Sequence, residues 1–296
     1  RTQGTNAIRQ YLGNLKDAGS LYGRIIYNKA PIMMRQLEYL LGENQFREGV
    51  QEYIKTYSNS NADWLELVDI LDQKSSGNIK NWSNVWVNSS GRPIISEEIE
   101  TNEKGNVTKF IIHQKAEDGS DKIWTQSFKI KLIDKRGYEK TINLKNMGKS
   151  FDISDAVKDF KPGQILYNSN GFGYGVFPVN KKEIITYKDI KDEVSRAYQF
   201  INLYENMLIG NVSPLETYNV MFEAILQEKN ELIVNYLSGI LQNIFWTFLN
   251  SETQEKLQDK INRELINLLE QDLPSNIKRT LFRLYQSVAI SQKGKE

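Results

Sequence analysis

The first 92 residues carry hydrophobic positions at helical spacing. Pro31 suits a first helical turn, where its missing N–H would be unpaired anyway, and Gly42 ends the apolar run that follows it. Three further amphipathic segments come before residue 92, and Asn61 is placed to cap the one that starts near Trp64. We therefore predict that residues 1–92 form short helices joined by tight turns.

The hydrophobic period changes to two after residue 92. Residues 107–114, 124–134 and 139–144 are rich in β-branched and aromatic side chains, and the glycine-bearing turns EDGSD and DKRGY separate them. Short alternating strands joined by such turns are typical of an antiparallel β-sandwich. We assign residues 93–187 to this domain.

Helical spacing returns for residues 188–296, in four long amphipathic segments interrupted at GNVSP, LNSE and LPSN. The predicted fold class is thus an α+β multidomain protein. Its order is a helical segment over residues 1–92, a β-sandwich over 93–187 and an α-helical domain over 188–296.

The charge balance makes several classes of partner poor candidates. The 296 residues include 38 basic and 37 acidic side chains, so the net charge is +1 and no long run of one sign attracts nucleic acid or anionic lipid. No apolar run approaches the roughly 18 residues of a membrane span, and the N-terminus lacks the pattern of a signal peptide. We expect a soluble chain, cytoplasmic or periplasmic, without nucleic-acid binding or membrane insertion. The start at Arg1 fits a processed or excised segment.

The chain is poor in side chains that bind transition metals. It has no cysteine and a single histidine, His113, whereas a hydrolytic zinc site normally uses two or three imidazoles with a carboxylate. We therefore expect no tight, stoichiometric zinc binding by this chain. It also has no Ser-His or Cys-His pair in a plausible context for nucleophilic catalysis.

Other polar or glycine-rich stretches have simple structural interpretations. The cluster GFGYG, residues 171–175, lacks the βαβ context of a dinucleotide site, so a turn between sandwich strands is favoured. His113 lies in an alternating strand and is expected at the surface or half-buried. The acidic pairs are expected at strand ends and turns as solvated charges; they are Glu97 with Glu98 and Glu117 with Asp118.

Tyr27 is the candidate catalytic residue. It stands four residues before Pro31, just ahead of a Met-rich apolar helix. A phenol at a helix start often only packs or hydrogen-bonds locally. It can also donate one directed hydrogen bond to an oxyanion that forms beside it. Position alone does not choose between these roles.

Four motifs in order resemble the aminopeptidase N-type zinc metallopeptidases, the gluzincin aminopeptidases. Tyr27, Asn28, Lys29 and Ala30 resemble the family's tyrosine-x-lysine-glycine-alanine segment, and LGENQFREGVQEYI resembles the pattern that follows it. The pair Asn61-Ala62 comes next, and WVNSSGRPII carries the tryptophan, glycine and proline signature that closes the catalytic domain. The resemblance is specific over residues 25–95, with Ala30-Pro31 departing from glycine-alanine. Beyond residue 95 it rests on architecture.

The resemblance implies a fold and an activity. Residues 1–92 would be the helical end of a thermolysin-like catalytic domain. The family's zinc helix and its substrate-anchoring strand should precede Tyr27, and this sequence contains neither. In the family the matching tyrosine stabilises the tetrahedral intermediate, while zinc polarises the scissile carbonyl. Tyr27 would have that role, Lys29 would be structural, and this chain alone would be inactive.

Two functions follow as hypotheses. In the first, the full-length parent is a zinc-dependent aminopeptidase acting on peptides, and its missing N-terminal part is the partner of this chain. In the second, the chain is a non-catalytic peptide-binding or scaffold module with the same architecture. The presence or replacement of a histidine-glutamate-x-x-histidine helix upstream would discriminate between them. Side-chain preference and oligomeric state are not determined by this sequence.

Overall fold

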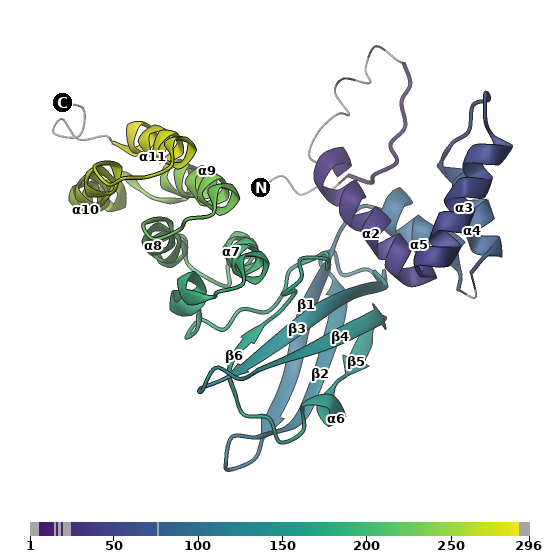
Figure 1. Cartoon of the computed structure of the whole chain (residues 1–296), viewed down its shortest axis with the longest axis horizontal. Coiled ribbons are helices and arrows are strands. Elements are labelled where there is room, and N and C mark those ends of the chain that lie inside the picture. The colour runs from purple at the N-terminus through teal and green to yellow at the C-terminus, as the bar shows by residue number, and fades with distance from the viewer. Residues whose placement is uncertain (1–5, 15, 17–18, 20–24, 76, 290–296) are drawn as a thin grey trace. The chain divides into compact units, whose positions relative to one another are not determined.

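The computed structural model describes residues 6–14, 16, 19, 25–75 and 77–289. The chain divides into two compact units, Arg1–Pro178 and Val179–Glu296. Helices come first, strands follow and helices return, which confirms the predicted fold class (Figure 1). The first helices and the strands share one unit, so the two units are described separately below.

The helical part of the first unit starts with a π-helical turn, η2 (Ile25–Lys29), and ends with another, η3 (Asn84–Asn88). Between them lie α2 (Ala30–Leu41), α3 (Glu43–Thr56), α4 (Trp64–Gln73) and α5 (Ile79–Ser83). Gly42 separates α2 from α3 with φ of 87°, a conformation that favours glycine. Their apolar faces form one core, whose buried members include Met33, Leu37, Leu71, Trp82 and Trp86.

The N-terminus of α4 corrects the predicted cap. Asp63, not Asn61, is the N-cap residue: its carboxylate accepts a hydrogen bond from the Leu65 amide at 2.6 Å. Glu66 completes a capping box by accepting from the Asp63 amide at 2.9 Å. The prediction of Asn61 was wrong because Asp63 directly precedes the first helical residue and has a glutamate three positions later.

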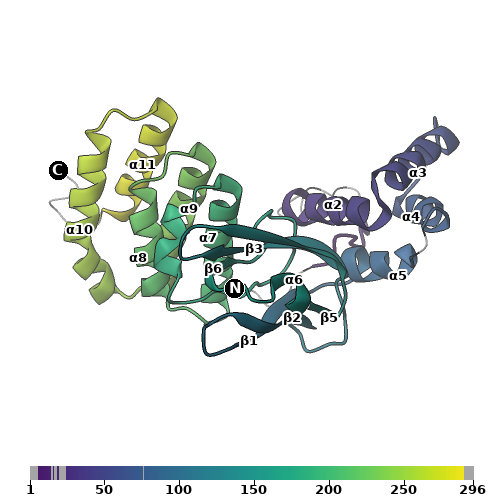
Figure 2. The ribbon, with the colours of Figure 1, turned by 60° about the horizontal axis from the view of Figure 1, so that its bottom comes forward.

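The strands form two three-stranded antiparallel sheets. One has the order β1-β2-β5 and the other β4-β3-β6, with the short helix α6 (Ser154–Val157) between β5 and β6. The strands are β1 (Pro93–Thr101), β2 (Val107–Ala116), β3 (Gln126–Asp134), β4 (Glu139–Met147), β5 (Ser150–Asp152) and β6 (Pro162–Leu166). Figure 2 shows the two sheets as separate layers.

Alternating side chains of both sheets fill the space between the layers. Phe110 and Ile112 of β2 are buried in the same cluster as Phe128 and Ile130 of β3. The rings of Phe128 and Phe177 meet edge to face with centroids 5.0 Å apart, a favoured aromatic geometry. The period-two pattern of the sequence therefore marks the true inner faces of the sandwich.

A buried glutamine joins the helical part to the sandwich. Gln36 of α2 donates through Nε2 to the carbonyl oxygens of Ser127 at 2.7 Å and Phe172 at 2.6 Å. Its Oε1 accepts from the Ser127 amide at 2.6 Å. One side chain thus satisfies three backbone groups that burial would otherwise leave unpaired. This bonding holds α2 against β3 and the loop after β6.

The second unit is helical. After the 3-10 turn η4 (Ile184–Asp189), five helices follow, with α9 packed against both α8 and α11 (Figure 2). They are α7 (Glu193–Leu208), α8 (Pro214–Ile225), α9 (Glu231–Phe248), α10 (Ser251–Leu269) and α11 (Ser275–Val288). Over the described part of the chain, no helix is long and apolar enough to cross a membrane.

Candidate functional site

Tyr27 lies at the centre of the π-helical turn η2, directly before α2. Pro31 explains why the helix entry is not a regular α-helix. It has no N–H to donate to the Tyr27 carbonyl four residues earlier, so the α-helical bond at this point cannot form. A single π turn is a common alternative and is frequent at functional sites.

The Tyr27 side chain projects toward solvent. It is 67% exposed, and no residue in the described ranges forms a hydrogen bond with its hydroxyl. The phenol is therefore available to donate to a group that approaches from outside these residues.

Lys29, which the resemblance leaves as structural, has the opposite environment. Its side chain is 7% exposed, and its Nζ is buried without a hydrogen-bond partner in the described part of the chain. Nζ lies 5.2 Å from the ring centroid of Tyr174. Burial, together with the positive charge of Lys122, lowers the pKa of the Lys29 ammonium group from 10.5 to about 8.

The acidic pair Glu117 and Asp118 is exposed and engaged in ion pairs. Arg92 Nε lies 2.9 Å from Glu117 Oε2. Lys122 Nζ donates to Asp118 Oδ2 at 2.7 Å and to the Ser90 carbonyl at 2.8 Å. Both acids lie in the exposed turn after β2, as expected, and each is also engaged by a cation: Glu117 by Arg92, which is distant in sequence, and Asp118 by Lys122, four residues later.

The tryptophan, glycine and proline signature forms the junction between η3 and the sandwich. Trp86 is fully buried and its Nε1 donates to the Thr125 carbonyl at 3.1 Å. Gly91 adopts φ of 101°, and its carbonyl accepts from the Tyr174 hydroxyl at 3.2 Å. Pro93 then begins β1. These residues fix the geometry of the junction and hold no chemical group ready for catalysis.

The cluster GFGYG follows the last strand, β6, and leads to an isolated bridge between Val176 and Ile94, so it does not connect two strands of the sandwich as expected. Gly173 makes two hydrogen bonds with the Asn168 side chain, at 2.7 Å and 3.1 Å, and Gly175 adopts φ of 136°. A Cβ at Gly175 would lie 2.6 Å from the Pro93 carbonyl oxygen. The glycines therefore allow close packing, and no helix N-terminus follows to receive a phosphate.

The single histidine lies on the outer surface of the first sheet. His113 of β2 has a 41% exposed side chain, with Nε2 3.6 Å from a carboxylate oxygen of Glu98. Glu97 and Glu98 lie inside β1, not at its end as expected. Glu98 also pairs with Lys109, and that hydrogen bond is the main cause of its lowered pKa. This is an exposed ion-pair group on a strand face.

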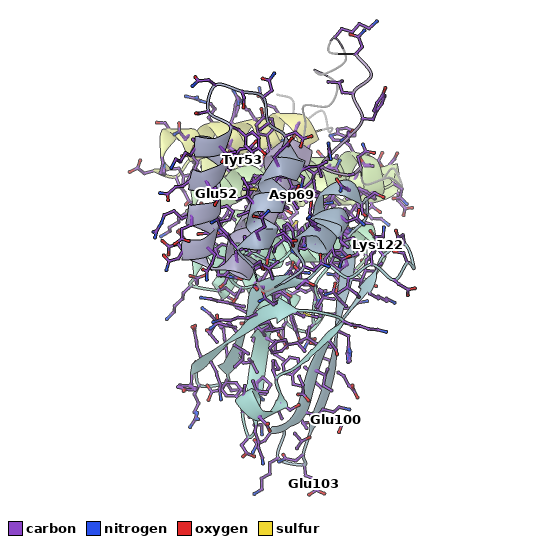
Figure 3. All side chains as sticks on the ribbon, turned by 90° about the vertical axis from the view of Figure 1, so that its right-hand side faces the viewer. Glu52, Tyr53, Asp69, Glu100, Glu103 and Lys122 are labelled. Carbon is purple, nitrogen blue, oxygen red and sulfur yellow. The ribbon has the colours of Figure 1, made fainter. Side chains whose placement is uncertain are left out.

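The residues that the structure describes do not fit a zinc ion. No three His, Asp or Glu side chains among them are grouped so as to hold a metal. Figure 3 shows how dispersed the acids are: Glu52 and Asp69 lie on the helices, whereas Glu100 and Glu103 lie at the far end of the sandwich. Glu52 and Asp69 are also engaged by lysines, Lys74 and Lys80. We derive no catalytic step through a metal held by these residues.

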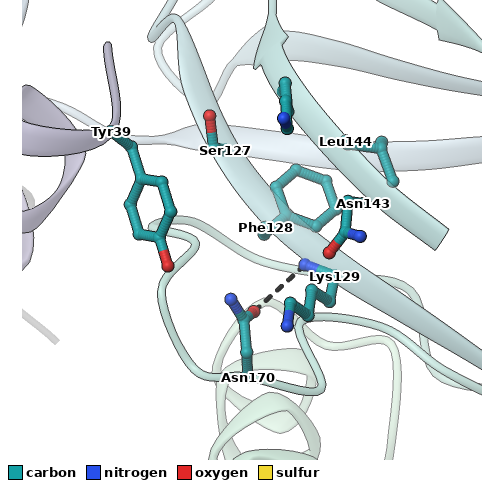
Figure 4. A pocket seen from close by; sticks show the side chains of 8 residues that line it. Tyr39, Ser127, Phe128, Lys129, Asn143, Leu144 and Asn170 are labelled. Atoms are coloured by element: carbon teal, nitrogen blue, oxygen red, sulfur yellow. Dashed lines mark hydrogen bonds between the residues drawn. The ribbon is translucent and has the colours of Figure 1, made fainter. Parts of the chain in front are cut away.

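Two concave features are found among the described residues, and only the second has the volume of a small-molecule site. A pocket between α2 and the β3–β4 face has a volume of about 50 Å³, well below the roughly 300 Å³ of a small-molecule site (Figure 4). Asn170 Oδ1 already accepts from the Lys129 amide there, at 3.0 Å. A second, polar cavity of about 390 Å³ lies in the helical unit. Its Arg196 is bound by both carboxylate oxygens of Glu228, at 2.7 Å and 2.9 Å.

Comparison with known proteins places these features in a family context. Residues 1–86 match the peptidase family M1 domain. Aminopeptidase N of Streptomyces lividans is 32% identical over 112 residues, which cover 38% of this chain and 13% of that protein. A probable aminopeptidase of Sulfurisphaera tokodaii is 22% identical over 276 residues, covering 93% of this chain and 32% of that protein.

A solved structure shares the fold. The crystal structure of Legionella pneumophila aminopeptidase A covers 98% of this chain and 38% of its own, with a TM-score of 0.60 and 14% sequence identity. These matches confirm the resemblance that the four motifs indicated. The chain spans between about an eighth and a third of the two curated relatives described here.

Proposed function

Because this chain is related to the aminopeptidases of peptidase family M1, we propose that the whole protein removes N-terminal residues from peptides. The proposal includes a zinc ion held by residues outside this chain, as the family resemblance implies. The residues described here would contribute one catalytic group and the structural elements that carry it. Alone, the chain would be inactive.

Tyr27 is the catalytic group in this proposal. The observation that supports it is an exposed hydroxyl, without a described partner, on a turn that matches the family's tyrosine segment. In peptide hydrolysis, negative charge develops on the scissile carbonyl oxygen. A preorganised phenol donor placed near that oxygen stabilises the tetrahedral intermediate more than the substrate, and so accelerates the reaction.

The turn η2 is held in place by the elements that follow it, as a hydrogen-bond donor to an oxyanion requires. It continues directly into α2, whose Gln36 is bonded to backbone groups of the sandwich. A donor on a rigid support is useful because catalysis by hydrogen bonding requires the donor to be in position before the charge forms. The sandwich therefore serves, in this proposal, as the base that fixes α2 and its entry turn.

The test is Tyr27→Phe in the whole protein, which removes only the hydroxyl. We expect kcat to fall by about 10² to 10³, equivalent to roughly 3 to 4 kcal/mol, with KM little changed. Tyr39→Phe is the matched control, since Tyr39 is also exposed, on α2, and has no proposed role. Its kcat should stay at the wild-type value.

Two outcomes would contradict the proposal. If Tyr27→Phe keeps normal turnover but melts at a clearly lower temperature, the phenol is structural. If the whole protein hydrolyses no aminoacyl substrate and lacks a histidine-glutamate-x-x-histidine helix, the non-catalytic scaffold hypothesis is correct.

A further inference from the structure

The buried amine of Lys29 is a feature that the proposed function does not use. Lysine normally buries its methylene stem and keeps the ammonium group in water. Here the Nζ atom itself is buried, without a hydrogen-bond partner in the described part of the chain. An unpaired buried charge is among the costliest features a fold can contain, so its presence calls for a physical reason.

Among the residues that the structure describes, none supplies a negative charge that acts on the Lys29 ammonium group. The charged neighbour that acts on it is Lys122, which is positive and raises the cost further. The carboxylate beside Lys122 is already engaged, since Asp118 pairs with Lys122 itself. The Tyr174 ring, 5.2 Å away, offers a cation–π contact, which is a weak replacement for a carboxylate.

The position of Lys29 indicates where a partner would come from. It ends the turn η2. Tyr27 and Asn28 of this turn are exposed, whereas the Lys29 side chain points to the other side, so a further part of the protein can cover the turn from its exposed side. A lysine side chain has four rotatable bonds, and a change of rotamer carries Nζ several ångströms. A carboxylate packed against the turn would therefore be within reach.

We propose that Lys29 is a positioning residue for Tyr27: its ammonium group pairs with a carboxylate from the zinc-binding part of the whole protein. This inference rests on the proposed function, and on the finding that the chain spans only a fraction of its relatives. A protein carboxylate is favoured over a substrate carboxylate because it stays in place when no substrate is bound, and so can compensate the buried charge of Lys29 throughout.

The pair would act on catalysis only through Tyr27. Fixing residue 29 fixes the turn η2, and hence the direction of the phenol two residues earlier. Loss of the pair would let the Tyr27 hydroxyl sample other positions. A smaller fraction of the protein molecules would then have the hydroxyl placed where the oxyanion forms. Substrate contacts elsewhere would be unaffected.

The first test is a double-mutant cycle on the whole protein, with Lys29→Met, Tyr27→Phe and the combined variant. Methionine keeps most of the side-chain volume and removes the charge. We expect Lys29→Met to lower kcat by about tenfold with KM unchanged, and to cause no further loss once Tyr27 is phenylalanine. Lys55→Met, at an exposed position of α3, is the control and should leave kcat unchanged.

The second test compares melting temperatures and needs no activity. Lys29→Met should lower the melting temperature of the whole protein, where the pair is broken, and should not lower that of the 296-residue chain. An equal loss in both would show that Lys29 is satisfied within this chain and would overturn the proposal. The proposal would also be overturned if the fold-losses in kcat of Lys29→Met and Tyr27→Phe multiply in the combined variant, because the two residues would then act independently. A reduced kcat for Tyr27→Phe alone would still support the proposed function.

Discussion

At the scale of single residues, Tyr27 and Lys29 differ sharply although they lie two positions apart on one turn. Successive residues point about 100° apart in an α-helix and somewhat less in a π-helical turn, so positions i and i+2 face nearly opposite sides in either case. One side of η2 meets solvent and the other meets the Tyr174 ring. A single turn can therefore present a hydroxyl outward and bury an amine beneath it.

The lowered pKa of Lys29 predicts a pH-dependent stability for this chain. Its folded-state pKa is about 8 against an ordinary value of 10.5. Between these values the unfolded chain binds the proton and the folded chain does not, so stability rises with pH across this window. The penalty for the buried charge is fully present below about pH 8 and amounts to about 3 kcal/mol.

Lys29→Met should remove this penalty in the 296-residue chain. We expect the variant to be more stable than the wild type at about pH 7, and the difference to shrink steadily as the pH rises towards about 10. Urea denaturation of both proteins across this range measures it, because other titrating groups cancel in the difference. A stability difference that does not change with pH would show that Lys29 titrates normally in the folded chain.

At the scale of elements, α2 joins the candidate site to the sandwich. Its buried face is apolar except for Gln36, which is 1% exposed and fully used in backbone hydrogen bonds. Apolar contacts alone would allow α2 to slide over the sheet, because the hydrophobic effect is not directional. Three directed bonds from one side chain select a single position, and with it the position of the turn η2.

Replacing Gln36 by leucine should therefore destabilise the first unit strongly. The change leaves the Ser127 amide and two carbonyl groups without partners, and each buried unpaired group costs about 1 to 3 kcal/mol. We expect a loss of about 3 kcal/mol or more in thermal or urea unfolding. Gln51→Leu, on the exposed face of α3, is the control and should change stability by less than about 0.5 kcal/mol. Equal effects of the two substitutions would refute this account of α2.

For most elements, the local pattern of apolar positions was sufficient to predict the type of secondary structure. Helix and strand types followed from periodicity, since each depends on which side of a short segment is apolar. The α4 cap was misplaced because two candidate residues, Asn61 and Asp63, precede Trp64. Their chemistry is nearly equal, and only the backbone geometry decides which one caps the helix.

At the scale of the whole molecule, the chain divides into two compact units between Pro178 and Val179. The segment that follows carries Lys181 and Lys182, both exposed and in a turn outside any strand or α-helix. Backbone of this kind is a preferred site for proteases. By contrast, Lys122 in the sandwich turn is held by two hydrogen bonds.

Limited trypsin digestion should therefore cut first after Lys181 or Lys182. We expect two fragments, one ending at this joint and one covering the helical unit, that both persist while the intact chain disappears. Mass spectrometry of a time course identifies the cut. First cleavage inside either unit, or rapid loss of both fragments, would contradict the division into two independently compact units.

The sequence by itself determined the order of the elements and the family resemblance. Both depend on local features: the period of apolar positions, and motif residues such as Tyr27 and Trp86 at fixed spacing. The domain limits at residues 92 and 187 and the catalytic role of Tyr27 stay predictions.

Only the tertiary structure decided which groups are exposed, buried or paired. The residues next to Lys29 in the sequence do not distinguish it from a surface lysine, and the Tyr174 ring that lies near its buried Nζ comes from far along the chain. Likewise, Glu117 gains Arg92 as a partner only when β2 folds against β1. Burial and pairing depend on which segments pack together in the folded protein. A short stretch of sequence does not show which distant segment will pack against it.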